Sequence, residues 1–294
     1  MPDPSPRFVD GIGALVDRYE AFILDQWGVL HDGAAPYPGV IEVLGRLKSR
    51  GKAIVLLSNS GRRAGFSGER LRRMGFDTTG FAAVVTSGEA TWQLMHRRPG
   101  PPWDRLGRRC VLLTHLGDRG VVQGLDTEVV DRAEDADFIF ASGMEPGQTV
   151  ESLRPLAEAG VARGLPVVCS NPDIVAVSQG ALATAPGAFA ALYREMGGTV
   201  HYVGKPHRPI YQACLDALPG VDQRAIVCVG DSLEHDIAGA AGVGLDSAFV
   251  MQGGIHAAEF APEYGPAVWA ERLDDLAARY GGARPTWALP RLVW

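Results

Sequence analysis

The feature that most constrains this sequence is the alternation of short apolar runs with segments of helical character along most of its 294 residues. Such an alternation is typical of a parallel β-sheet covered by helices. We predict strands at Phe22–Leu24, Ala53–Leu57, Ala82–Thr86, Cys110–Thr114, Asp137–Ala141, Pro166–Cys169, Val200–Val203, Ala225–Val229 and Ser247–Met251. We predict helices at Gly39–Arg50, Arg62–Met74, Glu89–Arg97, Gln148–Arg163, Phe189–Met196, Ile210–Leu218 and His235–Ala241. The sequence therefore predicts an α/β protein.

The composition predicts a folded, soluble protein. Hydrophobic residues make up 46% and charged residues 21% of the chain, and the formal net charge of -6 gives no reason to expect a nucleic-acid or membrane partner. No apolar run approaches the roughly 18 residues needed to span a bilayer, and Met1–Arg7 lacks the features of a signal peptide. The four cysteines show no C-x-x-C spacing, which favours buried free thiols in a reducing compartment. We expect a cytoplasmic location.

Polar residues of the kind that perform chemistry follow four of the predicted strands. Asp25 follows the first strand, and Ser58 with Asn59 follows the second. Lys205 and Asp231 follow two later strands. Ligands of an open parallel sheet bind beyond the carboxyl ends of its strands, so we expect these groups to converge.

The residue types in this group indicate phosphoryl transfer with a metal ion. Asp25 and Asp231 are hard oxygen ligands suited to Mg²⁺. Ser58 and Lys205 supply a hydrogen-bond donor and a positive charge for phosphoryl oxygens. A carboxylate beside a metal can also attack phosphorus and form an aspartyl-phosphate that water hydrolyses. Asp236 is placed either to hold a metal-bound water or to cap a helix.

Other phosphate-binding and nucleophile signatures are absent from the sequence. It contains no G-x-x-x-x-G-K-[ST], G-x-G-x-x-G, H-E-x-x-H or G-x-S-x-G motif. P-loop, dinucleotide-binding, zincin and serine-hydrolase functions therefore lose support.

The chain resembles the class IIA, NagD-like branch of the haloacid dehalogenase-like (HAD) hydrolase superfamily. Asp25–Gly33 is similar to motif I of that superfamily and Leu57–Asn59 to motif II. Val203–Pro206 is similar to motif III and Val229–Asp236 to motif IV. Cys169–Asp173 contains the Asn-Pro-Asp turn found in NagD-like caps. The resemblance covers roughly residues 20 to 255, with the four motifs in order.

The resemblance implies a Rossmann-like HAD core with a parallel sheet plus an inserted α/β cap domain of the class II type. Residues 1–86 and 197–294 would form the core, and residues 87–196 the cap. Such a cap would cover the site and exclude water on closing. Its apolar surface permits a homodimer without requiring one. The implied substrate is a small phosphorylated metabolite.

The resemblance also implies a role for each motif residue. Asp25 would be the nucleophile and a metal ligand, and Asp231 the second carboxylate ligand. Residue 27 would offer the metal its backbone carbonyl, and Asp236 would act on the metal site from behind the direct ligands. The phosphoryl group would be held by Ser58, Asn59 and Lys205, and Ser58 and Lys205 would also be catalytic. In the cap, substrate contact and a plain turn or helix start are both open for Asn171 and Asp173.

One residue departs from the family pattern. Family phosphatases usually carry, two residues after the nucleophile, an aspartate that protonates the leaving oxygen, and here that residue is Trp27. General acid–base catalysis is worth about 10²–10⁴-fold in rate, so ordinary esters would react that much more slowly. Gln26 does not titrate and cannot substitute, whereas His31 and Asp32 are near enough in sequence to be tested as replacements.

Three functions remain open from the sequence. The first is a Mg²⁺-dependent phosphatase restricted by its missing acid. The second is an enzyme that attacks carbon, as dehalogenases of the superfamily do, although the metal motif at Asp231 and Asp236 argues against it. The third is a phosphometabolite-binding or regulatory protein without turnover, for which Trp27 is the direct support.

Overall fold

The computed structural model describes residues 6–178 and 181–294, so most of the N-terminal segment in which we expect no signal peptide lies outside the described residues. The chain divides into two compact units. The first unit comprises Met1–Ser58, Gly68–Val85 and Pro206–Trp294, and the second comprises Asn59–Ser67 and Thr86–Lys205. Each unit has its own sheet and its own buried apolar side chains.

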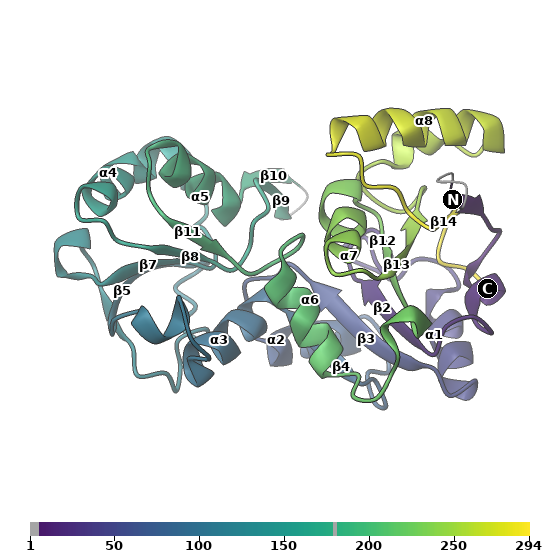
Figure 1. Ribbon diagram of the computed structural model, residues 1–294, viewed down its shortest axis with the longest axis horizontal. Helices are drawn as coiled ribbons and strands as arrows, with labels where there is room; N and C mark the ends of the chain where they lie inside the picture. The colour runs from purple at the N-terminus through teal and green to yellow at the C-terminus, as the bar shows by residue number, and fades with distance from the viewer. Residues whose placement is uncertain (1–5, 179–180) are drawn as a thin grey trace. The chain divides into compact units, whose positions relative to one another are not determined.

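A seven-stranded sheet forms the centre of the first unit, in the order β1-β14-β13-β12-β2-β3-β4. The strands are β1 (Arg7–Phe8), β2 (Ala21–Asp25), β3 (Ala53–Ser58), β4 (Ala83–Thr86), β12 (Ile226–Gly230), β13 (Asp246–Val250) and β14 (Trp287–Leu289). β2 pairs in parallel with both β3 and β12, as Figure 1 shows. All five residues of β2 are buried, as expected of a continuous apolar run in a strand covered on both faces.

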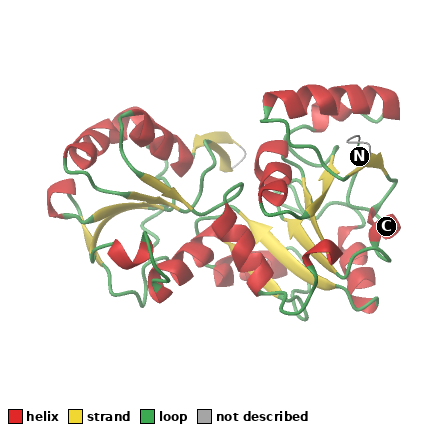
Figure 2. Ribbon diagram, in the orientation of Figure 1, coloured by secondary structure: helices red, strands yellow, loops and turns green. Residues whose placement is uncertain are grey.

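Helices flank the strands of the first unit (Figure 2). They are α1 (Val40–Ser49), α6 (Arg208–Asp216), α7 (Ala238–Gly242) and α8 (Pro266–Arg279), and α2 (Ala64–Arg73) lies across the chain boundary between the two units. α1 forms because its apolar residues recur at helical spacing, and it buries Val40, Val43, Leu44 and Leu47.

A five-stranded parallel sheet forms the centre of the second unit, in the order β11-β8-β7-β5-β6. The strands are β5 (Arg109–Leu113), β6 (Glu128–Val130), β7 (Phe138–Ala141), β8 (Val167–Cys169) and β11 (Val200–Tyr202). In addition, β9 (Val175–Ser178) pairs in antiparallel fashion with β10 (Ala181–Thr184). The helices are α3 (Ser87–Arg97), α4 (Val150–Ala162) and α5 (Pro186–Glu195). A reciprocal pair of hydrogen bonds between Thr149 and Ser152 starts α4.

The predicted α/β class with parallel sheets is confirmed. Every predicted strand coincides with an observed one, and every predicted helix coincides with a helix or helical turn. The predicted strand Val200–Val203 was expected in the core, but β11 pairs with β8 and lies in the second unit. The sequence pattern predicts that a segment forms a β-strand. Which strand it pairs with depends on contacts between residues that are distant in sequence.

The cysteines and the lengths of the helices can also be compared with the predictions. All four cysteines are free and buried, as predicted. Within residues 6–178 and 181–294, no helix combines the length and apolar character needed to cross a membrane.

Candidate active site

Two of the predicted site carboxylates lie at one edge of the first unit's sheet. Asp25 is the last residue of β2, and Asp231 directly follows β12. These strands are parallel neighbours in which Leu24 lies opposite Val229, so their carboxyl ends meet at the same edge. Both side chains are buried, with 7% and 4% of their surface exposed.

A third carboxylate, that of Asp236, is folded onto the same edge by the turn that follows β12. Residues Leu233–Ile237 form a π-helical turn that starts at Ser232, whose hydroxyl accepts a hydrogen bond from the His235 N–H at 3.1 Å. The Ser232 N–H donates to Asp236 Oδ2 at 3.1 Å. The buried Tyr211 hydroxyl donates to the Asp236 carbonyl at 3.2 Å. Ser232 is therefore the cap of this turn, and Asp236 lies in its first turn with its carboxylate close to the other two carboxylates.

The three carboxylates form a group that can hold a metal ion. One oxygen each from Asp25, Asp231 and Asp236 lies within 4.8 Å of the others. Buried carboxylates at this spacing repel one another unless protons or a cation neutralise them. An all-oxygen, negatively charged donor set is the kind that Mg²⁺ binds, so the residues present fit the predicted ion.

Three glycines leave room for these carboxylates. A Cβ atom added at Gly28 or Gly254 would overlap the carboxylate of Asp231, and one added at Gly230 would overlap Asp236. Gly28 has a φ of 84°, in the left-handed region. Gly28 and Gly230 lie within the predicted motifs I and IV, but no role was predicted for them. Gly254 was not predicted, although the glycine pair at 253–254, just after β13, was an available signal.

The backbone after Gly254 also holds Asp231. The Ile255 N–H donates to Asp231 Oδ2 at 3.0 Å, and such a bond favours the ionised carboxylate. The Ile255 side chain itself is exposed. The sequence contains no signal that identifies a backbone donor of this kind.

Trp27 lies in a tight turn directly after β2. The Leu30 N–H donates to the Gln26 carbonyl at 2.8 Å, and the Gly28 N–H donates to the His31 carbonyl at 3.0 Å. The half-buried Trp27 indole donates through Nε1 to the Asp32 carbonyl at 3.2 Å. The indole therefore braces the turn and carries no group that exchanges protons near neutral pH.

Neither suggested replacement is suited to act as the acid. His31 is buried, and its Nδ1 accepts from the Gly33 N–H at 3.1 Å. Burial, together with the charge of Arg70, lowers the His31 pKa to about 4, so the ring holds no extra proton at neutral pH. Asp32 accepts hydrogen bonds from the backbones of Ala35 and Ala34, which lower the pKa of its carboxyl.

The remaining motif residues are divided between the units. Ser58 ends β3 in the first unit, one residue beyond Leu57, which lies opposite Asp25. Asn59 and Lys205 belong to the second unit, and both are buried. Asn59 Oδ1 accepts from the Lys205 N–H at 2.7 Å, and Asn59 Nδ2 donates to the Lys205 carbonyl at 3.2 Å.

The two predicted cap residues join the same network in the second unit. Asn171 Oδ1 accepts from the Asp173 N–H at 3.0 Å, which is the tight turn weighed from the sequence. Asp173 Oδ1 accepts from Asn59 Nδ2 at 2.7 Å. Sequence reasoning missed Ser87, whose buried hydroxyl contacts the Asn59 carbonyl at 2.8 Å, because it lies outside every motif.

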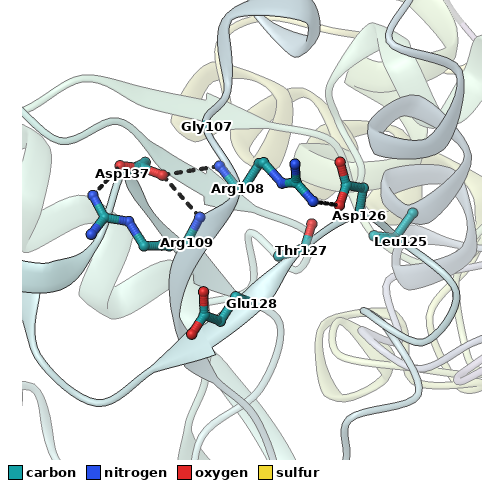
Figure 3. A pocket seen from close by; sticks show the side chains of 8 residues that line it. All are labelled: Gly107, Arg108, Arg109, Leu125, Asp126, Thr127, Glu128 and Asp137. Carbon is teal, nitrogen blue, oxygen red and sulfur yellow. Dashed lines mark hydrogen bonds and ion pairs between the residues drawn. The ribbon is translucent and has the colours of Figure 1, made fainter.

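A separate pocket of about 670 Å³ lies at the β5–β6 end of the second unit's sheet (Figure 3). Four of its charged side chains form two pairs: Arg109 contacts Asp137 at 2.9 Å, and Arg108 contacts Asp126. None of the predicted site residues lines it. This pocket is therefore distinct from the carboxylate group.

The chain is similar to known hydrolases of one family. Residues 22–128 match the haloacid dehalogenase-like hydrolase family, and residues 202–276 match a HAD-hydrolase-like family. A solved hydrolase of the haloacid dehalogenase-like family from Brucella suis 1330 is 31% identical, with a TM-score of 0.79, and the match covers 97% of this chain and all of that one.

Two curated relatives are phosphatases by name. The ribonucleotide monophosphatase NagD of Escherichia coli K12 is 28% identical over 92% of this chain and 96% of its own length. The D-glycerol 3-phosphate phosphatase of Mycobacterium tuberculosis is 27% identical over 82% of this chain, and the match spans 65% of that protein.

Proposed function

Because this chain belongs to the haloacid dehalogenase-like hydrolase superfamily, in its class IIA, NagD-like branch, we propose that it is a Mg²⁺-dependent phosphatase of a small phosphorylated metabolite. The observation that carries the proposal is the buried group of Asp25, Asp231 and Asp236 at the carboxyl edge of the sheet. The names of the two phosphatase relatives support the phosphorylated substrate class.

In the proposed reaction, a carboxylate oxygen of Asp25 attacks the phosphorus of a phosphomonoester, and the bond to the leaving-group oxygen breaks. Water then hydrolyses the aspartyl-phosphate, releases inorganic phosphate and restores Asp25. Ser58 and Lys205 bind phosphoryl oxygens. The ion would be held by Asp25, Asp231, Asp236 and the Trp27 carbonyl. When bound, Mg²⁺ supplies positive charge to the reacting phosphoryl group.

Trp27 restricts which substrates react well. Its indole donates a hydrogen bond to the Asp32 carbonyl and cannot protonate a leaving oxygen. A leaving group that is stable as an anion, such as an aryl oxide, needs no such proton. We therefore propose that aryl and acyl phosphates react faster than alkyl phosphates.

The second unit is proposed to serve as the cap that excludes water from the site. It has its own parallel sheet and its own buried apolar residues. Exclusion of water strengthens the interaction of fixed charges with the phosphoryl group.

A binding protein without turnover is the second candidate, and Trp27 favours it. Attack on carbon is disfavoured because a dehalogenase reaction has no use for the buried carboxylates of Asp231 and Asp236. The phosphatase and the binding protein differ in turnover, but either one should bind phosphate and Mg²⁺.

The test is phosphate release from a panel of aryl and alkyl phosphomonoesters, with Mg²⁺ or with a chelator, for the wild type and Asp25→Asn. Turnover that requires both Mg²⁺ and Asp25 supports the phosphatase. Phosphate binding without turnover above the Asp25→Asn rate, even on an aryl phosphate, supports the binding protein instead.

A further inference from the structure

Three segments of the second unit meet at the Asn59 side chain. The β8–β11 pairing extends beyond both strands, because the Val203 N–H donates to the Cys169 carbonyl at 3.0 Å and the Gly204 N–H donates to the Ser170 carbonyl at 3.1 Å. This extension places residues 203–205 beside residues 169–171. Asn59 forms hydrogen bonds to Lys205 in the first of these segments and to Asp173, two residues after the end of the second.

The Asn59 amide uses all of its N–H groups within the protein. A side-chain amide has one oxygen acceptor and two N–H donors. In Asn59 the oxygen accepts from the Lys205 N–H, one N–H faces the Lys205 carbonyl, and the other faces Asp173 Oδ1 at 2.7 Å. A flipped amide would set oxygen against two oxygens, so this network allows one orientation of the amide.

The packing around this amide is close. A Cβ atom added at Gly204 would lie 2.8 Å from Asn59 Oδ1 and 2.5 Å from Pro172 Cδ. The Ser87 hydroxyl contacts the carbonyls of Asn59 and Ser60 at 2.8 and 2.9 Å, which fixes the backbone that carries the amide. Asn59 is only 8% exposed. The side chain is therefore held between fixed partners and offers no N–H to a substrate.

We propose that Asn59 is a positioning residue for Lys205, and that Asp173 fixes the Asn59 amide in the orientation that Lys205 requires. This inference rests on the proposed function, which assigns Lys205 a phosphoryl group to bind. It replaces the phosphoryl and substrate contacts that the sequence predicted for the side chains of Asn59 and Asp173. Their effect on catalysis passes through the backbone of Lys205.

An exchange of the two side chains tests the proposal. Asn59→Asp sets a carboxylate against both Asp173 and the Lys205 carbonyl, and we expect kcat/KM to fall by about 10- to 100-fold, the value of a charged hydrogen bond lost in a buried site. Adding Asp173→Asn places an amide N–H donor at position 173, opposite the carboxylate at position 59. We expect the double variant to recover at least about fivefold over Asn59→Asp.

Two milder variants keep the test valid if Asn59→Asp does not fold. Asp173→Ala removes the oxygen that accepts from Asn59 Nδ2, whereas Asp173→Asn retains an oxygen at that position. Compared with Asp173→Ala, we therefore expect Asp173→Asn to have the higher kcat/KM and the higher affinity for inorganic phosphate with Mg²⁺. The matched control is Asp135→Asn, which changes an exposed carboxylate of the same unit that pairs with Arg132. A fall in activity common to all Asp→Asn variants overturns the proposal.

Hydrogen exchange provides a readout that does not depend on activity. The Lys205 N–H donates to Asn59 Oδ1, so Asn59→Ala should accelerate exchange in the peptide that contains residue 205. Unchanged exchange there, or equal phosphate affinity of Asn59→Asp with and without Asp173→Asn, overturns the inference. If the wild type releases no phosphate but exchange responds as expected, the proposed function fails and the positioning of Lys205 stands.

Discussion

The Asp231 carboxylate lies so close to the backbone of Gly28 and Gly254 that neither position has room for a side chain. Because the Cβ of Gly254→Ala would overlap the Asp231 carboxylate, we expect this variant to displace a ligand of the ion. The Mg²⁺ concentration for half-maximal activity should rise by about tenfold or more, the equivalent of about 1.4 kcal/mol. Titration of activity with Mg²⁺ measures the change.

Gly45→Ala is the matched control for that prediction. Gly45 lies within α1 and has no atom within 4 Å of an added Cβ. This variant should stabilise the fold by about 1 kcal/mol, the usual gain for alanine in a helix, and leave the Mg²⁺ requirement unchanged. An identical Mg²⁺ response of the two variants would show that the space beside Asp231 is not needed.

Trp27→Asp restores a titratable group two residues after Asp25. If the missing acid limits the reaction, kcat on alkyl phosphates should increase by about 10²–10⁴-fold, with a smaller gain on aryl phosphates. The control is Trp27→Phe, which keeps an aromatic ring and removes the bond to the Asp32 carbonyl. An equal gain in both variants would assign the effect to the turn and not to proton transfer.

His31 makes the stability of the first unit depend on pH. Its pKa falls to about 4 in the folded protein, mainly because of burial, so the unfolded chain binds more protons between pH 4 and 6.5. The contribution of His31 to the free energy of unfolding is fully present above pH 6.5. It is lost as the pH falls to 4, and the loss amounts to about 3 kcal/mol. Urea unfolding at several pH values should show this slope in the wild type and its loss in His31→Gln, but not in His96→Gln, where the residue is exposed.

At the scale of single residues, the sequence predicted the carboxylate group well and the Asn59 network poorly. Asp25 and Asp231 lie at the carboxyl ends of adjacent parallel strands, and residue type together with the position after a predicted strand was enough to predict their convergence. The role of the Asn59 amide depends on Asp173 and Lys205, which are distant in sequence and carry no periodic signal. Hydrogen bonds of this kind follow from tertiary packing alone.

At the scale of elements, β14 is a strand of the main sheet that was not predicted from the sequence. No strand was predicted beyond Ser247–Met251, yet Trp287–Leu289 pairs with both β1 and β13 in the main sheet. The strand is too short to show an alternating pattern over a useful length. Buried hydrogen bonds join it to the sheet: Trp287 Nε1 donates to the Tyr19 hydroxyl at 2.8 Å, and that hydroxyl donates to Asp246 at 2.6 Å.

Leu289→Ala tests the contribution of β14 to stability. Leu289 is completely buried and lies opposite Val250, so its truncation should reduce the free energy of unfolding by about 2–5 kcal/mol. Leu116→Ala, at a side chain that is 68% exposed, should change it by less than about 0.5 kcal/mol. Denaturant unfolding compares the two, and a similar small loss in both would show that β14 adds little to the core.

At the scale of the whole molecule, the carboxylates proposed to hold Mg²⁺ all belong to the first unit. Mg²⁺ should therefore slow hydrogen exchange in the strands of that unit, with a stabilisation of about 2.7 kcal/mol at one hundred times the dissociation constant. Protection in β5, β7 and β8 of the second unit should change less. Asp231→Asn should abolish the effect, and protection that persists in this variant would place the ion elsewhere.

The strand order of the first unit also has a consequence for synthesis on the ribosome. β2 acquires β3 as a neighbour early, but its other neighbour, β12, is translated only after the continuous stretch Thr86–Lys205 of the second unit. At about 5–20 residues per second, the apolar edge of β2 waits on the order of ten seconds for its partner. An unpaired edge of a strand with four successive apolar residues invites association with other chains, so the nascent protein is a natural client for chaperones during that interval.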